Sequence, residues 1–500
     1  MPRHIIGLEE KSCKRFQAVS AATLSSLKSS CYFHIFLTRD RYIFLANLPS
    51  YYFYVCMEWK AIFVGALLAA VTIIVGTSST NRQIQWVRRL SNTTDQATAA
   101  SETMVNIMGV NIQKATPSTN PVTYVPGQLV DSPDGKLRVS TGLTCNLIAN
   151  SGKKVTYKNG NTSDIEFHDL PDAGECFPDP DGTGWIYVGN SEVRYGKGGV
   201  GALSFDAEGN IIKYKMLLTK TSKNCSGGRT SWRTWVSCEE NDIYGHCWQI
   251  DPSGKRAAQK TVLGGDGGRF EAFAYDERDP KTPRFFVTED QVNGALRRFT
   301  PSADTVHMAT VANDRWHVLH GPGKLEYLVL TPEGETNGTF HWSSNIEEGR
   351  NSAELYFRNS EGISVVNDKL YFVAKTRGNL VVLDLDEGMY DIASTTGGYF
   401  DGKPDQVKWL ISTGGILYLY FTEENGRPNG IHGRDQYNRA FTVLEGTGYS
   451  SETTGLAFSP NSMHLYVAFQ KDGVLYDCFR EDGYPFIGRA LDIRYNFLDK

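Results

Sequence analysis

Short apolar and aromatic runs recur along the chain from about residue 140 and alternate with glycine-containing turns. Each run, such as GWIYVGNSE at 184–192 or LYLYFTEEN at 417–425, is followed by a second run that carries an aromatic residue or an aspartate. Runs of this length between turn residues are typical of strands. No long stretch after residue 105 has helical periodicity, so the pattern predicts an all-β fold.

These runs repeat at a nearly constant interval. They start 50 residues apart in the first half of the region and 47 apart in the second, at Trp185, Trp235, Phe285, Leu370, Leu417 and His464. A period of 40–50 residues with several strands per unit is typical of a β-propeller blade, because only a closed ring buries both faces of each sheet. We expect six blades. Seven blades, with the extra unit around KLEYLVL at 324–330, and an irregular pair of β-sandwiches are the alternatives.

Acidic residues end four of these runs at the same point of the repeat. They are Glu192; Cys238 with Glu239 and Glu240; Glu289 with Asp290; and Glu423 with Glu424. Equivalent strand ends converge near the axis of a propeller, where unpaired carboxylates raise one another's pKa and destabilise the fold. Bound cations remove that cost: carboxylates favour calcium or magnesium, and a thiol beside them favours iron or zinc. The alternatives are solvated turns and, for Cys238, an apolar position or a disulfide with Cys225.

Three more acids lie outside that point of the repeat, one beside a glycine-rich turn and two just before apolar strands. They are Glu271 in GGRFEAFAYD, Glu361 in NSEGISVV and Glu452 in ETTGLAFSP. Each is a candidate metal ligand, with a solvated loop acid as the alternative.

The N-terminal region has a different pattern. An apolar run of 16 residues spans 61–76 and follows Lys60. It is shorter than the ~20 residues of a spanning helix and fits the core of a secretory signal that starts at Met57. We predict a leader or cytosolic tail at 1–56, a signal peptide or signal anchor at 57–79, a linker at 80–135 and the propeller at 136–500. The protein is therefore expected to be secreted, or anchored to the membrane if 61–76 is not cleaved.

Composition adds three constraints. A net charge of −5 over 500 residues excludes the basic footprint of a nucleic-acid-binding protein. Four glycosylation triplets agree with export, at Asn92, Asn161, Asn224 and Asn337. Six cysteines follow the signal, some of which should pair in an oxidising compartment: Cys145, Cys176, Cys225, Cys238, Cys247 and Cys478.

Several phrases together resemble the PhoX-type alkaline phosphatase family, particularly its eukaryotic-looking branch. They cover roughly 140–490 in order, and the most specific is NCSGGRTSWRTWVSCEE at 224–240; the others are GGRFEAFAYD, FVTEDQVNGALRRFTP, EGISVVNDKLYFVAK, STTGGYFDGKPDQ, YFTEEN and ETTGLAFSPNSMHLYVAFQ. The resemblance implies a six-bladed propeller that hydrolyses phosphomonoesters with ferric iron and calcium at its axis. It implies Cys238 as an iron ligand and, as metal-binding carboxylates, Glu192, Glu239, Glu271, Asp290 and Glu361.

The chain departs from the bacterial members of that family where phosphate is bound. Asn359 stands in place of the arginine that is thought to grip phosphate in their Arg-Pro-Glu, and Ser191 replaces the histidine of their Asn-His-Glu. Lys375, Arg434 and Arg298 are the candidate cations that remain, with ordinary surface charges as the alternative.

We therefore expect a secreted, monomeric, metal-dependent hydrolase of small phosphate esters, with Asn359, Lys375 and Arg434 as candidate catalytic residues. Two other functions stay open. A calcium-dependent lactonase or esterase propeller needs only a cation held by carboxylates. A non-catalytic, calcium-binding propeller would present its faces to a carbohydrate or protein partner.

Overall fold

The computed structural model describes residues 129–412 and 415–487, and the backbone of four strands outside them. Three of these strands, β1 (Tyr32–Leu37), β2 (Arg41–Leu48) and β3 (Tyr51–Glu58), form an antiparallel sheet within a unit that ends at Asn92. The fourth is β33 (Arg494–Tyr495). The expected signal core at 61–76 and the linker up to residue 128 lie outside the described residues. No helix in the described part combines the length and the apolar composition needed to cross a bilayer.

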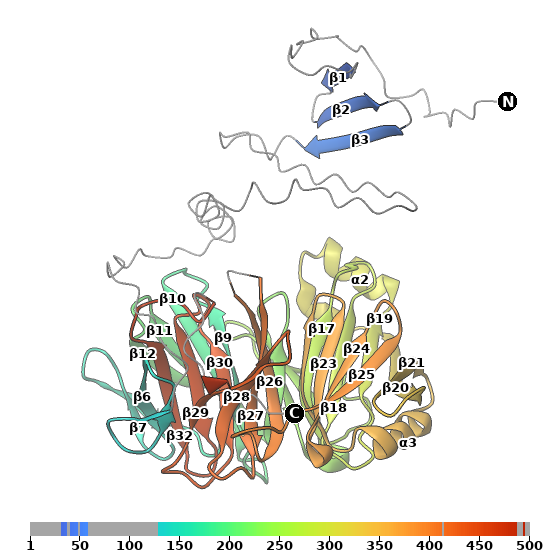
Figure 1. The fold of residues 1–500 in the computed structure, drawn as a ribbon. Coiled ribbons are helices and arrows are strands. Elements are labelled where there is room, and N and C mark those ends of the chain that lie inside the picture. The colour runs from blue at the N-terminus through green and yellow to red at the C-terminus, as the bar shows by residue number, and fades with distance from the viewer. Residues whose placement is uncertain are drawn as a thin grey trace, which may run out of the picture. The chain divides into compact units, whose positions relative to one another are not determined.

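The strands of the second unit stand side by side in Figure 1. They form six blades, each with four antiparallel strands. From the axis outwards, the first three blades are β9 (Pro171–Pro178), β10 (Gly184–Ser191), β11 (Gly198–Asp206) and β12 (Ile211–Thr221); β13 (Asn224–Arg229), β14 (Trp235–Glu239), β15 (Cys247–Ile250) and β16 (Gln259–Lys260); and β17 (Phe270–Asp276), β18 (Arg284–Glu289), β19 (Arg297–Pro301) and β20 (Gly323–Pro332). The last three are β22 (Ser360–Val366), β23 (Lys369–Ala374), β24 (Asn379–Asp384) and β25 (Met389–Ser394); β26 (Lys403–Ile411), β27 (Leu417–Glu424), β28 (Gly430–Asp435) and β29 (Ala440–Glu445); and β30 (Thr453–Phe458), β31 (His464–Phe469), β32 (Val474–Arg480) and β6 (Leu143–Asn150).

The ring is closed by its first strand. β6 precedes the first blade in sequence, yet it pairs with β32 as the outermost strand of the sixth blade. Cys145 of β6 and Cys478 of β32 face each other in register and form a disulfide across 333 residues of sequence. The innermost strands contact one another in the order β9, β13, β17, β22, β26, β30 and back to β9. The predicted propeller is confirmed, with six blades in the described residues.

The long interval between residues 285 and 370 holds an insertion rather than a further blade. KLEYLVL belongs to β20, the outer strand of the third blade. The insertion contributes α2 (Ala303–Val311), β21 (Asn337–Ser343) and α3 (Ile346–Tyr356). β21 pairs with both β20 and β25, so the third and fourth blades form one continuous sheet. Two short strands, β4 (Val130–Asp131) and β5 (Arg138–Val139), extend the fifth blade, and β7 (Lys154–Thr156) pairs with β8 (Thr162–Glu166) as a hairpin.

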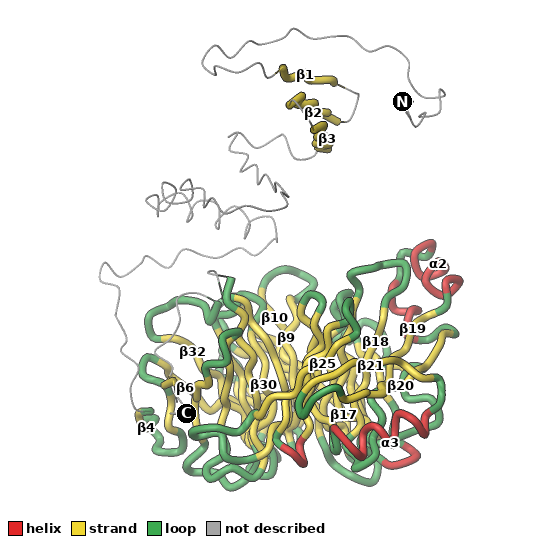
Figure 2. Tube along the Cα trace, turned by 45° about the vertical axis from the view of Figure 1, so that its right-hand side comes forward, coloured by secondary structure: helices red, strands yellow, loops and turns green. Residues whose placement is uncertain are grey.

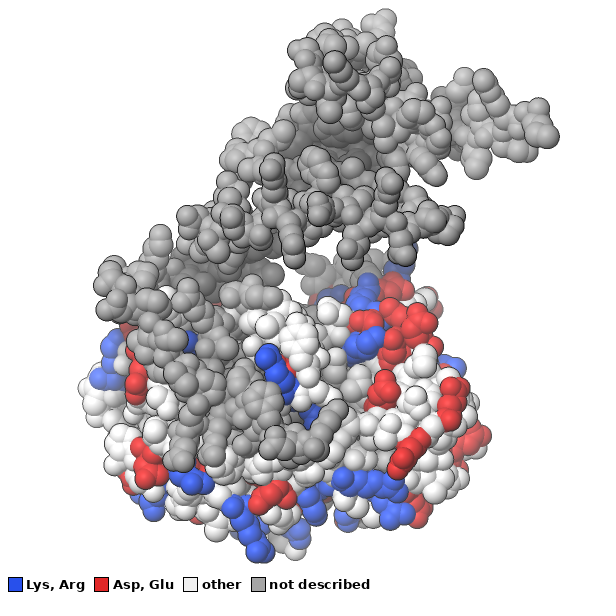
Figure 3. All heavy atoms as spheres, viewed as in Figure 1, with Lys and Arg blue, Asp and Glu red and all other residues white. Residues whose placement is uncertain are grey.

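The hydrophobic core lies between neighbouring blades. Trp235 of the second blade is fully buried against Val188 and Val200 of the first. Its indole Nε1 donates to Asn190 Oδ1 at 2.9 Å, so the packing contact also satisfies the polar end of the ring. Loops gather at the two ends of the strands, with the strands between them (Figure 2). On the face shown in Figure 3, the visible lysines and arginines are interspersed with acids.

Candidate metal centre on the propeller axis

A β-bulge near the start of the innermost strand recurs in all six blades. At each bulge two residues of the inner strand oppose one residue of the second strand. Bulges change the direction of a side chain and are common beside active sites. The first residue of each bulge is, in chain order, Asp172, Cys225, Glu271, Glu361, Asp405 and Gly455. Five of the six blades thus contribute a carboxylate or a thiol at one equivalent position.

A second set of polar residues follows the second strands. In each blade, one residue of the second strand lies opposite the bulge of the innermost strand. Two residues further along the chain, the first five blades carry Glu192, Glu240, Asp290, Lys375 and Glu424. In the sixth blade, Gln470 follows the end of β31. Its Nε2 donates to Asp172 Oδ2 and to Glu192 Oε2, both at 2.9 Å, which connects the two sets.

Only the second acid of each predicted pair belongs to this group. Adjacent residues of a strand point to opposite faces, and the first acid of each pair is bound within its own blade. Glu423 accepts from the backbone amides of Gly402 at 2.6 Å and Gly430 at 2.9 Å. Glu239 accepts from Trp248 Nε1 at 2.9 Å. Glu289 lies 3.7 Å from Arg297 Nη2. The structure therefore places Glu239, Glu289 and Glu423 apart from the axial acids.

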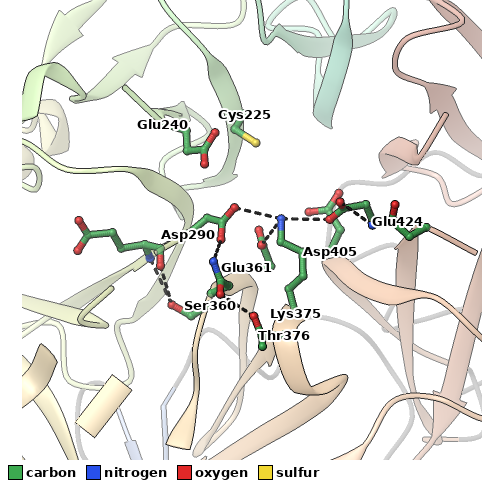
Figure 4. Close-up of polar contacts among 12 residues, drawn as sticks. Cys225, Glu240, Asp290, Ser360, Glu361, Lys375, Thr376, Asp405 and Glu424 are labelled. Atoms are coloured by element: carbon green, nitrogen blue, oxygen red, sulfur yellow. Dashed lines mark hydrogen bonds and ion pairs between the residues drawn. The ribbon is translucent and has the colours of Figure 1, made fainter. Parts of the chain in front are cut away.

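Lys375 lies among carboxylates from three blades (Figure 4). Its Nζ is 2.6 Å from Glu361 Oε1, 3.0 Å from Asp290 Oδ2 and 3.1 Å from Glu424 Oε2. Asn359, with a positive φ of 54°, donates from Nδ2 to Asp290 Oδ1 at 2.7 Å. Asn359 thus orients an acid of the site and brings no charge.

On the other side of the group, the Sγ atom of Cys225 lies 3.5 Å from Asp172 Oδ2. Gln406 donates to Asp172 Oδ1 at 3.1 Å. Lys223 forms ion pairs with Glu192 and Glu240. The axial carboxylates are nine: Asp172, Glu192, Glu240, Glu271, Asp290, Glu361, Asp405, Glu424 and Glu452. In the described residues, Lys223 and Lys375 form ion pairs with five of them, Glu192, Glu240, Asp290, Glu361 and Glu424.

Burial, together with this excess of negative charge, shifts the pKa of several axial carboxyl groups. Burial, and then the charges of Asp405 and Glu240, raise the pKa of Glu271 well above its usual value. Burial is also the first cause for Glu240 and for Glu452, and raises the pKa of each to about 7. Asp290 is the exception. Burial acts to raise its pKa, but the charge of Lys375 and the hydrogen bond from Asn359 outweigh burial and keep the pKa low.

The donor atoms fit bound cations. The ligand atoms of Asp172, Glu192 and Cys225 lie within 4.8 Å of one another, and so do those of Glu271, Glu361 and Asp405. Glu271 is 1% exposed, and neither of its carboxylate oxygens has a hydrogen-bond partner among the described residues. Buried charges without partners are strongly destabilising, and multivalent cations compensate them.

The sulfur in this group is Cys225, whereas the sequence pattern pointed to Cys238. Cys238 opposes the bulge that contains Cys225, and its sulfur lies 3.7 Å from that of Cys247. Asp172 and Asp405 were also missed. A signal for these residues exists in the sequence, because each stands near the start of an innermost strand, as Glu271 and Glu361 do.

Two candidate cations lie elsewhere. Arg434 on β28 donates to the backbone carbonyl of Ser394. Arg298 on β19 pairs with Glu326 at 2.6 Å and stacks over Trp342 at 4.5 Å. Neither arginine contacts the axial acids, so Lys375 is the one member of that set placed at the site.

The fold and this group together define a β-propeller with an acidic, thiol-containing cluster on its axis. Among solved structures, PhoX of Pseudomonas fluorescens, determined in complex with vanadate, a transition state analogue, is similar over 73% of this chain and 99% of its own, with 12% identity and a TM-score of 0.56. A gluconolactonase of Xanthomonas campestris aligns over 74% of this chain and 99% of its own, with 13% identity and a TM-score of 0.38. A putative 6-phosphogluconolactonase of Bacteroides uniformis aligns over 67% and 91%, with 15% identity and a TM-score of 0.37. No protein-family model and no curated protein matches the chain. The likeness to PhoX establishes a shared propeller fold.

Proposed function

We propose that this protein is a metal-dependent hydrolase of phosphomonoesters. One observation carries the proposal: five blades contribute acids and a thiol through the same bulge, and the ligand atoms of these residues lie in two compact groups. The sequence phrases that resemble PhoX-type phosphatases and the fold shared with PhoX support this choice of chemistry.

Two kinds of ion fit the two donor sets. Cys225 with Asp172 and Glu192 would hold iron, because a thiolate is a softer ligand than calcium accepts. Glu271, Glu361 and Asp405 would hold calcium through oxygen ligands alone. Such ions neutralise phosphate oxygens and lower the pKa of a coordinated water towards neutrality.

Residues of the chain itself would attract the charged substrate and keep the acids in position. Lys375 and Lys223 are the cations at the site that are positioned to attract a phosphate group. Asn359 keeps Asp290 in place, and Thr376 in turn donates to Asn359 Oδ1 at 2.5 Å. In this proposal Asn359 is a positioning residue, and binding of phosphate relies on the lysines in place of an arginine.

Action outside the cytosol is part of the proposal. The disulfide between Cys145 and Cys478 supports an oxidising compartment. Of the glycosylation triplets, Asn161 and Asn337 are exposed, whereas Asn224 is fully buried and donates to Ser237 Oγ, which corrects its assignment as an acceptor. Asn92 lies outside the described residues.

The test is hydrolysis of p-nitrophenyl phosphate by the purified full chain, supplied with iron and calcium, between pH 6 and 10. We expect turnover by the wild type and a loss of about 100-fold or more in Glu271→Gln, which weakens an oxygen ligand. Glu208→Gln, at an exposed acid on the blade surface, is the matched control and should retain full activity. An inactive, metal-loaded wild type would refute the phosphatase. A parallel assay with a sugar lactone separates a lactonase from it.

A non-catalytic, metal-stabilised propeller is the second candidate. It is favoured by one observation: the amide that replaces the family arginine is already bound to Asp290. In that case removal of calcium would lower the melting temperature, while neither the ester nor the lactone would be hydrolysed.

A further inference from the structure

We propose that Lys375 is a built-in cation that takes the place of one metal ion in the axial site. The inference rests on the metal-binding part of the proposed function. It adds that the chain itself supplies one of the positive charges that its acids require.

The first argument is position. At the equivalent point after the second strand, the first, second, third and fifth blades carry Glu192, Glu240, Asp290 and Glu424, the sixth carries Phe469, and the fourth carries Lys375. A lysine in place of an acid at this position changes the net charge of the site by two, since it removes one negative charge and adds a positive one. The site therefore requires fewer exogenous charges than an all-acidic ring would.

The second argument is the surroundings of the ammonium group. Its three neighbours, Asp290, Glu361 and Glu424, come from the third, fourth and fifth blades, so no single loop accounts for the cluster. The side chain of Lys375 is 20% exposed. Its ammonium group donates a hydrogen bond to Asp290 Oδ2, and its positive charge is paired with Glu361 and Glu424 as well. Oxygens gathered from several elements around one positive centre are also what calcium requires.

The third argument concerns the acids that Lys375 does not compensate. Both oxygens of the buried Glu271 remain without a hydrogen-bond partner in the described residues. Glu271 and Asp405 lie with Glu361 in one group of ligand atoms, yet no ion pair joins either of them to a lysine or arginine in the described part. Exogenous ions are thus needed around Glu271 and Asp405, whereas Asp290 and Glu424 already have a cation.

The experiment counts calcium per chain by elemental analysis after equilibration of the full-length protein in excess calcium and removal of unbound ions. Lys375→Gln should bind one more ion than the wild type, because three carboxylates lose their partner. Lys375→Arg, which keeps the charge, should bind the wild-type number. Equal counts in the wild type and a folded Lys375→Gln would overturn the inference.

A second variant tests the same idea without removing the lysine. Glu424→Gln should keep the wild-type ion count, because Glu424 pairs with Lys375 and not with a bound ion, and its side chain is partly exposed. Loss of an ion from Glu424→Gln would contradict the inference even if Lys375→Gln fails to fold. Absence of phosphatase activity in the wild type would refute the proposed reaction but would leave these ion counts unchanged.

A separate observation concerns Cys238 and Cys247. They face each other in register on β14 and β15, both are fully buried, and their sulfurs are 3.7 Å apart. The neighbouring amide of Glu239 donates to the carbonyl of His246, so the cysteines occupy a non-hydrogen-bonded pair. In such pairs the Cα atoms are about 4.5 Å apart, within the span of a disulfide. Cys145 and Cys478 are bonded in the same cross-strand relationship.

We infer that Cys238 and Cys247 form a second disulfide in the exported protein. The two thiols would give two protons and two electrons to a disulfide of the secretory pathway, which is reduced to two thiols as the new sulfur–sulfur bond forms. Residues 239–246 lie between the two cysteines and include the axial acid Glu240. The bond would therefore fix the loop that presents Glu240 to the site, and it would leave Cys225 free as a ligand.

Trypsin places both cysteines in one peptide, 234–255, since no lysine or arginine lies between them. In protein secreted by a eukaryotic host, the mass of this peptide should be lower by two hydrogen atoms than that of the dithiol form. Its cysteines should resist alkylation until the peptide is reduced. Cys176 and Cys225 should be alkylated directly once the protein is denatured. Alkylation of both Cys238 and Cys247 without reduction would overturn the inference.

Discussion

Cys225 and Cys238 lie on opposite sides of one β-bulge, and only the sulfur of Cys225 reaches the axial acids. Cys225 is the first of two inner-strand residues that oppose Cys238 on β14. The Cys225 sulfur lies with the carboxylates of Asp172 and Glu192, whereas Cys238 lies against Cys247 in the interior of the blade. Two thiols of one sequence phrase, 224–240, therefore have different surroundings and should differ in chemistry.

The first prediction follows from this difference. Cys225→Ser should lose bound iron, because a hydroxyl is a poor substitute for a thiolate, and any visible absorbance of the iron should disappear with it. Cys238→Ser should retain iron and its absorbance, since its sulfur is not in the ligand group. Iron per chain by elemental analysis, together with the absorbance spectrum, checks both variants. Retention of iron by Cys225→Ser with loss from Cys238→Ser would reverse the assignment.

The sequence was sufficient to predict the ring of blades and part of the axial site. The repeat of strands predicted a propeller, and the position of Glu192, Glu240 and Asp290 at one point of that repeat predicted that they converge. Both predictions depend only on periodicity, which a single sequence displays directly.

The remaining details depend on structure that periodicity does not report. A bulge adds one residue to the inner strand, so the choice between Cys225 and Cys238 depends on a local register shift without a sequence signature of its own. Similarly, the contact of Lys375 with Asp290 and Glu424 requires the relative placement of three blades. The exact number of strands in the 285–370 interval was likewise hidden, because an insertion with β21 replaced a regular repeat.

The metal-free protein should become less stable as pH rises. The pKa of Glu240 and that of Glu452 are each raised from 4.5 to about 7 in the folded state, primarily by burial. Between these values the folded carboxyls hold protons that the unfolded ones have released, so the free energy of unfolding falls through this window, by roughly 3 kcal/mol for each group. Above pH 7 the loss is complete.

Thermal melts in a chelator between pH 4.5 and 8 measure this dependence. The double variant Glu240→Gln/Glu452→Gln should match the wild type at pH 4.5 and exceed its melting temperature at pH 8. A double variant that melts below the wild type at pH 8 would show that the two charges are compensated without metal. Calcium should reverse the order, because the wild type offers ionised ligands to the ion and the amides do not.

The two acids of one pair should have different effects. Glu423 is fully buried, and its carboxylate holds the amides of Gly402 and Gly430 and contacts His432 Nε2 at 2.9 Å. Glu423→Ala should therefore lower the free energy of unfolding by about 3–5 kcal/mol, as expected when one partner of a buried charged network is removed. Its bound-metal count should stay at the wild-type value, because this side chain faces away from the axis.

The matched control is Glu424→Gln at the neighbouring position. Its carboxylate is partly exposed and pairs with Lys375, so we expect a change of less than about 1 kcal/mol. Urea unfolding of both variants in the presence of calcium provides the comparison. Similar stability losses in the two variants would indicate that both acids serve the same structural purpose, contrary to the alternation along β27.

The disulfide that closes the ring should contribute more to stability than any other bond of its kind in the described residues. It links Cys145 to Cys478 across 333 residues, and the stabilisation from restricting the unfolded chain grows with the length of the closed loop. Cys145→Ser/Cys478→Ser should lose about 4–5 kcal/mol, whereas Cys238→Ser/Cys247→Ser, which removes the short loop of the inferred second disulfide, should lose about 3 kcal/mol or less. Urea denaturation of both double variants in calcium gives the two values. A ring-closing variant as stable as the wild type would mean that the pairing of β6 with β32 holds the propeller closed without the covalent bond.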